Sequence, residues 1–238
     1  MIWWIVATLC AFFVKGLCGF ANTLVFTSIM SFGLSNRDIS PVELLLGYPT
    51  NALIAFRERR AIDWKLCLPL SALVAAGSIP GILLLKGADT RAVKLLFGVV
   101  IVAVGVEMLL REHTKKPVKE SRLLLGVIGL LSGVLCGLYG VGALLGAYVG
   151  RVAKDSSAFR ANLCVVFFIE NTMRIALYGA CGLLGAGMLW QAVRLAPCMA
   201  AGLYLGVRCR GLLDEKRAKE LVIVTLIISG LSLIAAQM

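Results

Sequence analysis

Few side chains inside the apolar runs of this sequence carry a charge, and these few are the first candidates for chemistry. Glu170 and Arg174 lie near the middle of the apolar run 158–180. An ionisable group at the centre of a membrane span costs on the order of 2.5–3.5 kcal/mol, so it usually faces a partner or a wet cavity. The acid precedes the base by four residues, the favourable order for a helical ion pair. Either the pair is a structural salt bridge, or Arg174 holds an anion while Glu170 neutralises it or carries a proton.

Two asparagines form a second candidate group. Asn51 and Asn171 lie within two different apolar runs, at corresponding places. Gly47 and Pro49 come just before Asn51 and predict an interrupted helix with free carbonyl groups. If the two runs belong to inverted halves, the two amides meet near the middle of the bilayer, where transporters of that architecture bind substrate. The alternative role is hydrogen bonding between packed helices.

Two glycine-rich joints each connect a pair of short apolar pieces. The joint 136–142 contains three glycines within six residues, and the joint 15–22 has fewer glycines but adds a lysine and an asparagine. Such joints predict interrupted helices, and the free N–H groups at the start of a half-helix bind anions. The residues expected to contact a ligand here are Asn22, Gly140 and Gly142, with Lys15 as a coupling charge or ion-pair partner.

The remaining reactive residue types predict no cofactor. The sequence has eight cysteines without a CxxC pair and a single histidine, His113, in a charged loop. Zinc, haem and histidine-based catalysis therefore lack ligands, and the cysteines are interpreted as small buried apolar residues. Glu43 follows Pro41 and is interpreted as an acid that stabilises the first turn of a helix.

The elements that must position these residues are membrane-spanning helices. The chain has 238 residues, of which 60% are hydrophobic and 16% charged, and its mean hydropathy is +0.92. One soluble core cannot hide so much apolar surface, which excludes a soluble enzyme, a disordered protein and a nucleic-acid binder. At about 20 residues per span, the chain could cross a bilayer about eight to ten times. The continuous apolar runs predict an all-α fold; they are 2–14, 16–34, 41–56, 64–85, 93–110, 123–136, 138–152, 158–180, 184–207 and 220–236.

The chain divides into two similar halves. A basic, polar linker, residues 111–122, separates a first membrane repeat, residues 1–110, from a second, residues 123–238. Several features recur in the same order about 120 residues apart, including an asparagine in a span and a tryptophan at the start of the next span. An internal duplication explains this order, with one broken or re-entrant glycine-rich hairpin in each half.

The basic residues orient the two halves. Loops 57–65, 111–122 and 208–219 hold 14 of the 24 lysines and arginines, so we expect them on the cytoplasmic side. The counterpart of the first loop, residues 181–189, carries no charge. Equivalent loops on opposite sides are typical of inverted repeats. This arrangement places both chain termini outside.

Several of these motifs together resemble the TauE/SafE sulfite exporter family. In chain order these motifs are the turn Arg60–Lys65, the Pro80-Gly81 pair and the joint Gly137-x-x-Gly140-x-Gly142. Their combination in this order resembles that family, and the resemblance covers essentially the whole chain. The resemblance implies a permease for small sulfur-containing or other organic anions in the bacterial inner membrane. Family members usually carry more glycines at the first joint, where this chain has Phe20-Ala21-Asn22.

The predicted function is a multi-pass secondary transporter of the inner (plasma) membrane that moves small anions, such as sulfite, sulfonates or organic acids. No Walker A motif occurs, so a proton or the membrane potential is the expected driving force. The expected partners are a small-molecule anion and the lipid bilayer, with a homo-oligomer as an option, and no nucleic acid. The alternatives are a transporter of a cation or neutral solute, a structural membrane protein, or an intramembrane lipid-modifying enzyme, although the protein is predicted not to be an enzyme.

Overall fold

The fold is helical throughout the part of the chain that can be described. The computed structural model describes residues 1–30, 34, 36–87, 122–140 and 142–209, with single residues between 95 and 109 and between 224 and 234. No strand occurs among these residues, which confirms the predicted all-α class. The predicted spans 93–110 and 220–236 and the linker 111–122 lie largely outside the described residues.

The same sequence of helices occurs before and after the linker. A long helix is followed by a short one and then by two long ones. Before the linker these are α1 (Ile2–Cys18), α2 (Asn22–Met30), α3 (Asn36–Arg57) and α4 (Trp64–Gly87), with a 3₁₀ turn η1 (Arg59–Ala61) ahead of α4. After the linker they are α6 (Arg122–Tyr139), α7 (Ala143–Val152), α8 (Ser156–Ala180) and α9 (Ala186–Cys209).

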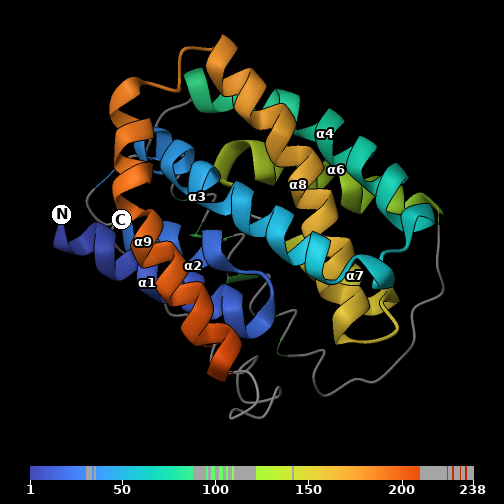
Figure 1. Ribbon diagram of the computed structural model, residues 1–238. Helices are drawn as coiled ribbons and strands as arrows, with labels where there is room; N and C mark the ends of the chain where they lie inside the picture. The colour runs from blue at the N-terminus through green and yellow to red at the C-terminus, as the bar shows by residue number, and fades with distance from the viewer. Residues whose placement is uncertain are drawn as a thin grey trace.

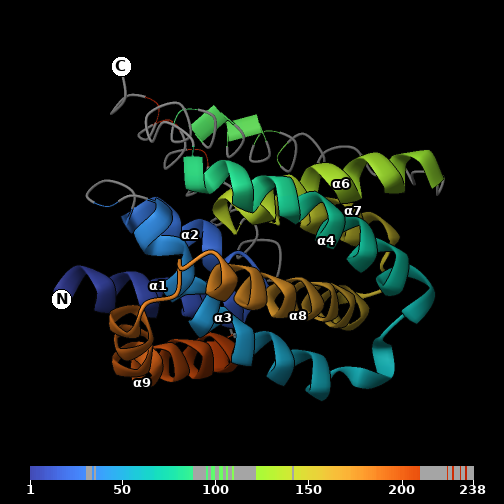
Figure 2. The ribbon, with the colours of Figure 1, turned by 90° about the horizontal axis from the view of Figure 1, so that it is seen from above.

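Two closely packed helix pairs flank the molecule. Helix α1 packs against α9, and α4 packs against α6; both views show the two pairs on opposite sides (Figures 1 and 2). Glycines allow the backbones to approach: a Cβ atom on Gly16 would lie 2.7 Å from Gly206 Cα, and one on Gly137 would lie 3.0 Å from Gly81 Cα. Small residues at such contacts are the usual means of close helix packing in membranes.

Helices α3 and α8 cross in the middle of the molecule (Figure 1). They run antiparallel, because the Ser40 hydroxyl at the start of α3 lies 3.1 Å from the Tyr178 hydroxyl at the end of α8. Tyr48 and Phe168 stack between them, with ring centroids 4.9 Å apart. Helix α3 continues through Pro49, so the predicted interruption is wrong. Packing against α8 holds the helix together where the proline removes one backbone donor.

The turn between α3 and α4 is fixed to the first turns of α8. Glu58 accepts hydrogen bonds from Arg160, at 3.0 Å, and from Ser157. The Asp63 backbone N–H donates to Asn162 Oδ1 at 2.7 Å. The other loop, residues 181–185, follows the last residue of the same helix. The basic turn and the uncharged loop therefore lie at opposite ends of α8, which is 25 residues long and so spans roughly 37 Å.

Two helices of the described residues have the length and apolarity to cross a membrane. They are Trp64–Leu83 within α4, with a mean hydropathy of 1.9, and Ser156–Ala180, with a mean hydropathy of 1.4. Large apolar side chains also point outward from other helices, among them Ile2, Trp3, Leu53 and Phe56. An apolar exterior of this kind is what a lipid environment requires.

Candidate functional site

The first predicted joint is a break of three residues between α1 and α2. Helix α1 ends at Cys18, and Gly19 turns the chain with φ 86°, its N–H bonding to the Lys15 carbonyl at 2.7 Å. Ala21 also has a positive φ, 71°. An L-residue other than glycine is strained in this region. The break therefore holds one residue, Ala21, in a conformation that glycine would adopt freely.

The second joint breaks the chain in the same way between α6 and α7. Helix α6 continues to Tyr139, and Gly140 turns the chain with φ 72°. A Cβ atom on Gly140 would lie 3.0 Å from Thr23 Cγ2 and 3.2 Å from both terminal nitrogens of Arg174. Glycine is thus required here twice, by the backbone angle and by the closeness of its neighbours.

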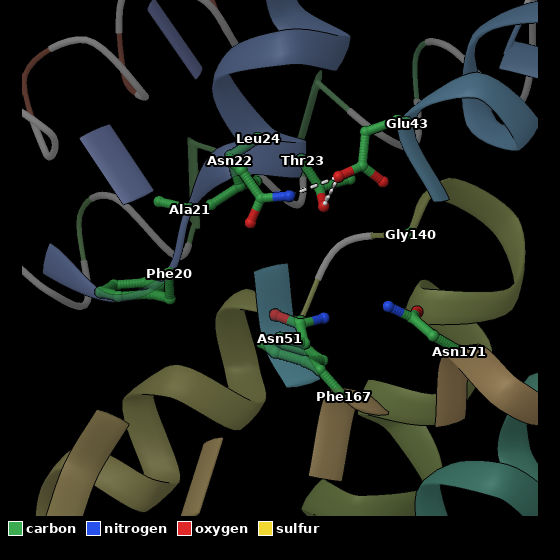
Figure 3. Close-up of a pocket in the computed structure, with 11 residues that line it drawn as sticks. Phe20, Ala21, Asn22, Thr23, Leu24, Glu43, Asn51, Gly140, Phe167 and Asn171 are labelled. Carbon is green, nitrogen blue, oxygen red and sulfur yellow. Dashed lines mark hydrogen bonds between the residues drawn. The ribbon is translucent and has the colours of Figure 1, made fainter. Parts of the chain in front are cut away.

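The two breaks meet at one pocket (Figure 3). Its walls include residues 20–24 from the first break, Gly140 and Gly142 from the second, and side chains of α3 and α8. Figure 3 shows Asn22 and Glu43 on one side of this space and Asn51 and Asn171 on the opposite side. The complete lining is Phe20, Ala21, Asn22, Thr23, Leu24, Glu43, Asn51, Gly140, Gly142, Phe167 and Asn171. The cavity volume is about 20 Å³, room for about one water molecule.

Lys15 lies behind the pocket and orients one of its amides. The Lys15 ammonium donates to Asn51 Oδ1 at 2.6 Å, and Lys15 is only 1% exposed. A lysine ammonium can only donate and an amide has one acceptor oxygen, so this bond fixes which end of the Asn51 side chain faces Lys15. The Asn51 Nδ2 group remains as the donor for the pocket.

Glu43 is a pocket residue that the sequence analysis assigned to another role. Helix α3 begins at Asn36, so Glu43 lies two turns inside the helix, and the predicted first-turn role is wrong. Its Oε1 atom accepts hydrogen bonds from Asn22 Nδ2 at 2.5 Å and from Thr23 Oγ1 at 2.8 Å. The signal that could have identified Glu43 is an acid within the apolar run 41–56, the same signal that singled out Glu170.

Arg174 and Glu170 form a buried pair just outside the pocket lining. The Arg174 Nε and Glu170 Oε1 atoms are 3.7 Å apart, an ion pair without a hydrogen bond. Arg174 Nη2 donates to the Ser40 hydroxyl at 2.9 Å and to the Tyr178 hydroxyl at 3.2 Å. Ser78 donates to Glu170 Oε1 at 3.1 Å. The guanidinium lies beside Gly140, where an added Cβ atom would be 3.2 Å from both of its terminal nitrogens.

The predicted site residues therefore fall into two groups. Those on the pocket surface are Asn22, Asn51, Gly140, Gly142 and Asn171. Those buried behind the surface are Lys15, Glu170 and Arg174. The described residues contain no cluster of three His, Cys, Asp or Glu side chains that could hold a metal ion.

The pocket combines amide groups with one carboxylate, that of Glu43. The half-helices α2 and α7 both begin beside it, so the positive ends of two helix dipoles lie at the pocket. Amide groups of Asn51 and Asn171 add neutral donors. The buried charges of both signs, Lys15 and Arg174 against Glu43 and Glu170, sum to zero when all four are ionised.

Comparison with known proteins identifies the family. Searches of curated proteins and of solved structures give no match. The sequence model of the sulfite exporter TauE/SafE family matches residues 4–233, almost the entire chain. The chain therefore belongs to the TauE/SafE sulfite exporter family of membrane transport proteins.

Proposed function

We propose that the protein is a secondary permease that exports or imports small anions, with sulfite, sulfonates and related organic acids as its substrates. The observation that carries this proposal is the meeting of two helix breaks at one buried pocket that also contains Asn51 and Asn171. Family membership supports a transport function. The pocket supports the anion class, because backbone and amide donors can replace the water that an anion loses on entering the protein.

The positive charges behind the pocket support the same assignment. Arg174 lies beside Gly140 of the pocket lining, and Lys15 donates a hydrogen bond to Asn51. A charge in a surrounding of low polarity acts over several ångströms. Both cations therefore stabilise an anion without touching it.

The carboxylate of Glu43 favours the alternative of a cation as substrate, because it is the charged side chain on the pocket surface. Two features argue for the anion instead. The first turn of α2, including Asn22 and Thr23, already satisfies Glu43 Oε1, and the nearby cations balance the acid. The transport assays below include cations for this reason.

An inverted repeat is the architecture that best accounts for the packing. The contact of α1 with α9 corresponds to the contact of α6 with α4 when the halves are exchanged. Tyr48 stacks on Phe168, its own counterpart 120 positions later, as expected for residues beside a two-fold axis. Asn51 and Asn171, also 120 positions apart, both line the pocket. These relations support two inverted halves whose re-entrant hairpins are α1–α2 and α6–α7.

We further propose a multi-pass protein of the inner membrane with loops 57–65, 111–122 and 208–219 in the cytoplasm. The basic turn and the uncharged loop 181–185 lie at opposite ends of α8, which supports opposite sides for these equivalent loops. Cysteines introduced at positions 115 and 236, in a variant without native cysteines, test this topology. Labelling of the two positions from opposite sides is expected, and labelling from one side would contradict the inverted repeat.

A substrate screen in proteoliposomes tests the proposed function. Purified protein is reconstituted, and the flux of sulfite, thiosulfate, methanesulfonate, acetate, sodium and potassium is compared with that in protein-free vesicles. We expect flux of at least one sulfur oxyanion and none of the cations. Flux of a cation alone would overturn the anion assignment, and the Asn51→Ala variant shows whether the flux passes through the pocket.

A further inference from the structure

The hydrogen-bonding groups of the pocket are arranged with acceptors on one side and donors on the other (Figure 3). The Lys15 ammonium donates a hydrogen bond to the Asn51 oxygen, which leaves the Asn51 NH₂ group for a ligand. Asn22 gives its NH₂ group to Glu43, which leaves the Asn22 oxygen as an acceptor. On the side of Asn22 and Glu43, the pocket therefore presents oxygen atoms, one of them on a carboxylate.

A fully deprotonated oxyanion fits only half of this arrangement. Its oxygens can accept from the amides of Asn51 and Asn171, but they meet the oxygens of Asn22 and Glu43 with no hydrogen between them. Both hydrogen bonds drawn to Glu43 in Figure 3 go to the same oxygen, Oε1. One additional proton, placed on the ligand or on Glu43, turns this oxygen–oxygen contact into a hydrogen bond.

The charges around Glu43 also indicate that an anion needs one additional proton at the pocket. The groups that act on it electrostatically are Lys15 on α1, Cys136 on α6, and Glu170 and Arg174 on α8. With all carboxylates and both cations ionised and the thiol neutral, these charges together with Glu43 sum to zero. A monoanion alone would leave one uncompensated negative charge in a buried place, which is strongly unfavourable. A monoanion accompanied by one proton restores the balance.

We infer that the pocket takes up an oxyanion together with one proton, and that Glu43 is the residue that accepts this proton. The inference deepens the proposed function and rests on it. The proton comes from the water on the side of entry, binds to Glu43 Oε2 or remains on the anion, and leaves with the anion on the other side. No covalent bond is made or broken other than this O–H bond. A carboxylate such as acetate can carry the proton itself, whereas the monoanions hydrogensulfite and methanesulfonate are conjugate bases of strong acids and cannot. Transport of these two therefore depends entirely on Glu43.

The experiment measures accumulation of methanesulfonate in proteoliposomes under a pH gradient that is acidic outside. The wild type is expected to accumulate it above the outside concentration. Glu43→Gln copies the protonated acid, so it should still exchange labelled for unlabelled methanesulfonate but should lose accumulation and the dependence of flux on pH. Asp38→Asn, which removes an exposed acid at the start of the same helix, is the matched control and should behave as wild type.

A second variant covers the case in which Glu43→Gln is inactive. Glu43→Asp retains a carboxyl group and should retain accumulation driven by the pH gradient. Accumulation by Glu43→Gln at the wild-type level, or loss of accumulation in a folded Glu43→Asp protein that still exchanges, would overturn the inference. If the wild type moves no anion in either assay, the proposed function itself fails, and this result is distinct from both.

Discussion

The two halves of the protein use their buried charges differently. Before the linker, Lys15 and Glu43 come from different helices and bond to amides of the pocket, Asn51 and Asn22. After the linker, Glu170 and Arg174 lie one turn apart on α8 and pair with each other behind the pocket. The difference indicates a division of work. We propose that the first pair determines which hydrogen bonds a ligand can make and that the second pair contributes charge. The second pair also links α8 to α3 through Ser40 and to α4 through Ser78.

This difference predicts that the second pair matters more for stability and the first more for ligand binding. Glu170 has one oxygen, Oε2, without a hydrogen-bond partner among the described residues, and Arg174 Nε is likewise unbonded. Removing one member of a buried pair leaves the other uncompensated. In contrast, Lys15 and Glu43 each bond to a neutral amide. Replacing either charged side chain leaves a neutral amide without its hydrogen-bond partner, which costs less than leaving a charge unpaired. The predictions below test this contrast, from the largest effect to the smallest.

The largest effect is expected for Arg174→Gln. Leaving Glu170 as an unpaired buried acid should lower the free energy of unfolding by about 3–5 kcal/mol, measured as a lower unfolding temperature in detergent. The double variant Arg174→Gln with Glu170→Gln should regain most of this stability but remain inactive for anions, because the positive charge is gone. Arg194→Gln, at an exposed arginine stacked on Trp190, is the control. Normal anion transport by the double variant would make the pair purely structural.

Lys15→Met should affect binding more than folding. Methionine has a similar shape, so the core is retained, but the charge-assisted bond that orients Asn51 is lost. Such a bond contributes about 1.5–3 kcal/mol, so we expect the dissociation constant for sulfite to rise between about tenfold and about a hundredfold. Lys65→Met, at the exposed start of α4, is the matched control. A Lys15→Met protein that binds sulfite as the wild type does would remove Lys15 from the site.

Asn51→Ala and Asn171→Ala should each weaken binding by a smaller amount. Each change removes one neutral donor from the pocket surface, and a neutral hydrogen bond contributes about 0.5–1.5 kcal/mol. An increase of about threefold to about tenfold in the dissociation constant for sulfite is expected. Equal effects at the two positions would support their two-fold relation. An unchanged constant in both variants would show that ligands do not use these amides.

The smallest effect distinguishes the two helix breaks. Gly140 adopts its positive φ without strain, whereas Ala21 does not. Ala21→Gly should therefore raise the free energy of unfolding, by about 1 kcal/mol at most, since an L-residue in the left-handed region costs about 1–2 kcal/mol and glycine orders more entropy on folding. Ala55→Gly, in the interior of α3, should change it in the opposite direction. Destabilisation by Ala21→Gly would mean that the break is held by contacts of the methyl group.

Much of the fold and part of the site could be predicted from the sequence. The apolar runs predicted most helix ends to within five residues and the start of α2 to within six. The glycines at 19 and 140 marked the two breaks. The relation of Asn51 to Asn171 followed from their equal place in two halves. The role of Pro49 was missed because tertiary packing against α8 overrides local helix breaking. The position of Glu43 was missed because the start of α3, at Asn36, lies in a polar stretch that carries no apolar periodicity.

The contacts of Arg174 outside its own helix could not be predicted from spacing. Helical periodicity placed it one turn from Glu170, which the structure confirms. The guanidinium lies next to Gly140, which belongs to the break between α6 and α7. The spacing of residues within α8 says nothing about this neighbour. Outside the internal repeat, the sequence carries no signal for a contact between segments so far apart. The same holds for the bond of Lys15 to Asn51.

The central claim is that an anion binds between the two helix breaks, and calorimetric titration of sulfite into the purified protein tests it most directly. Three proteins are compared: the wild type, the double variant Asn51→Ala with Asn171→Ala, and Thr172→Ala, which changes the exposed neighbour on the same helix. We predict saturable binding of sulfite by the wild type and by Thr172→Ala. In the double variant we predict a dissociation constant raised about tenfold to about a hundredfold. Equal affinity of all three proteins for sulfite would contradict a site at this pocket.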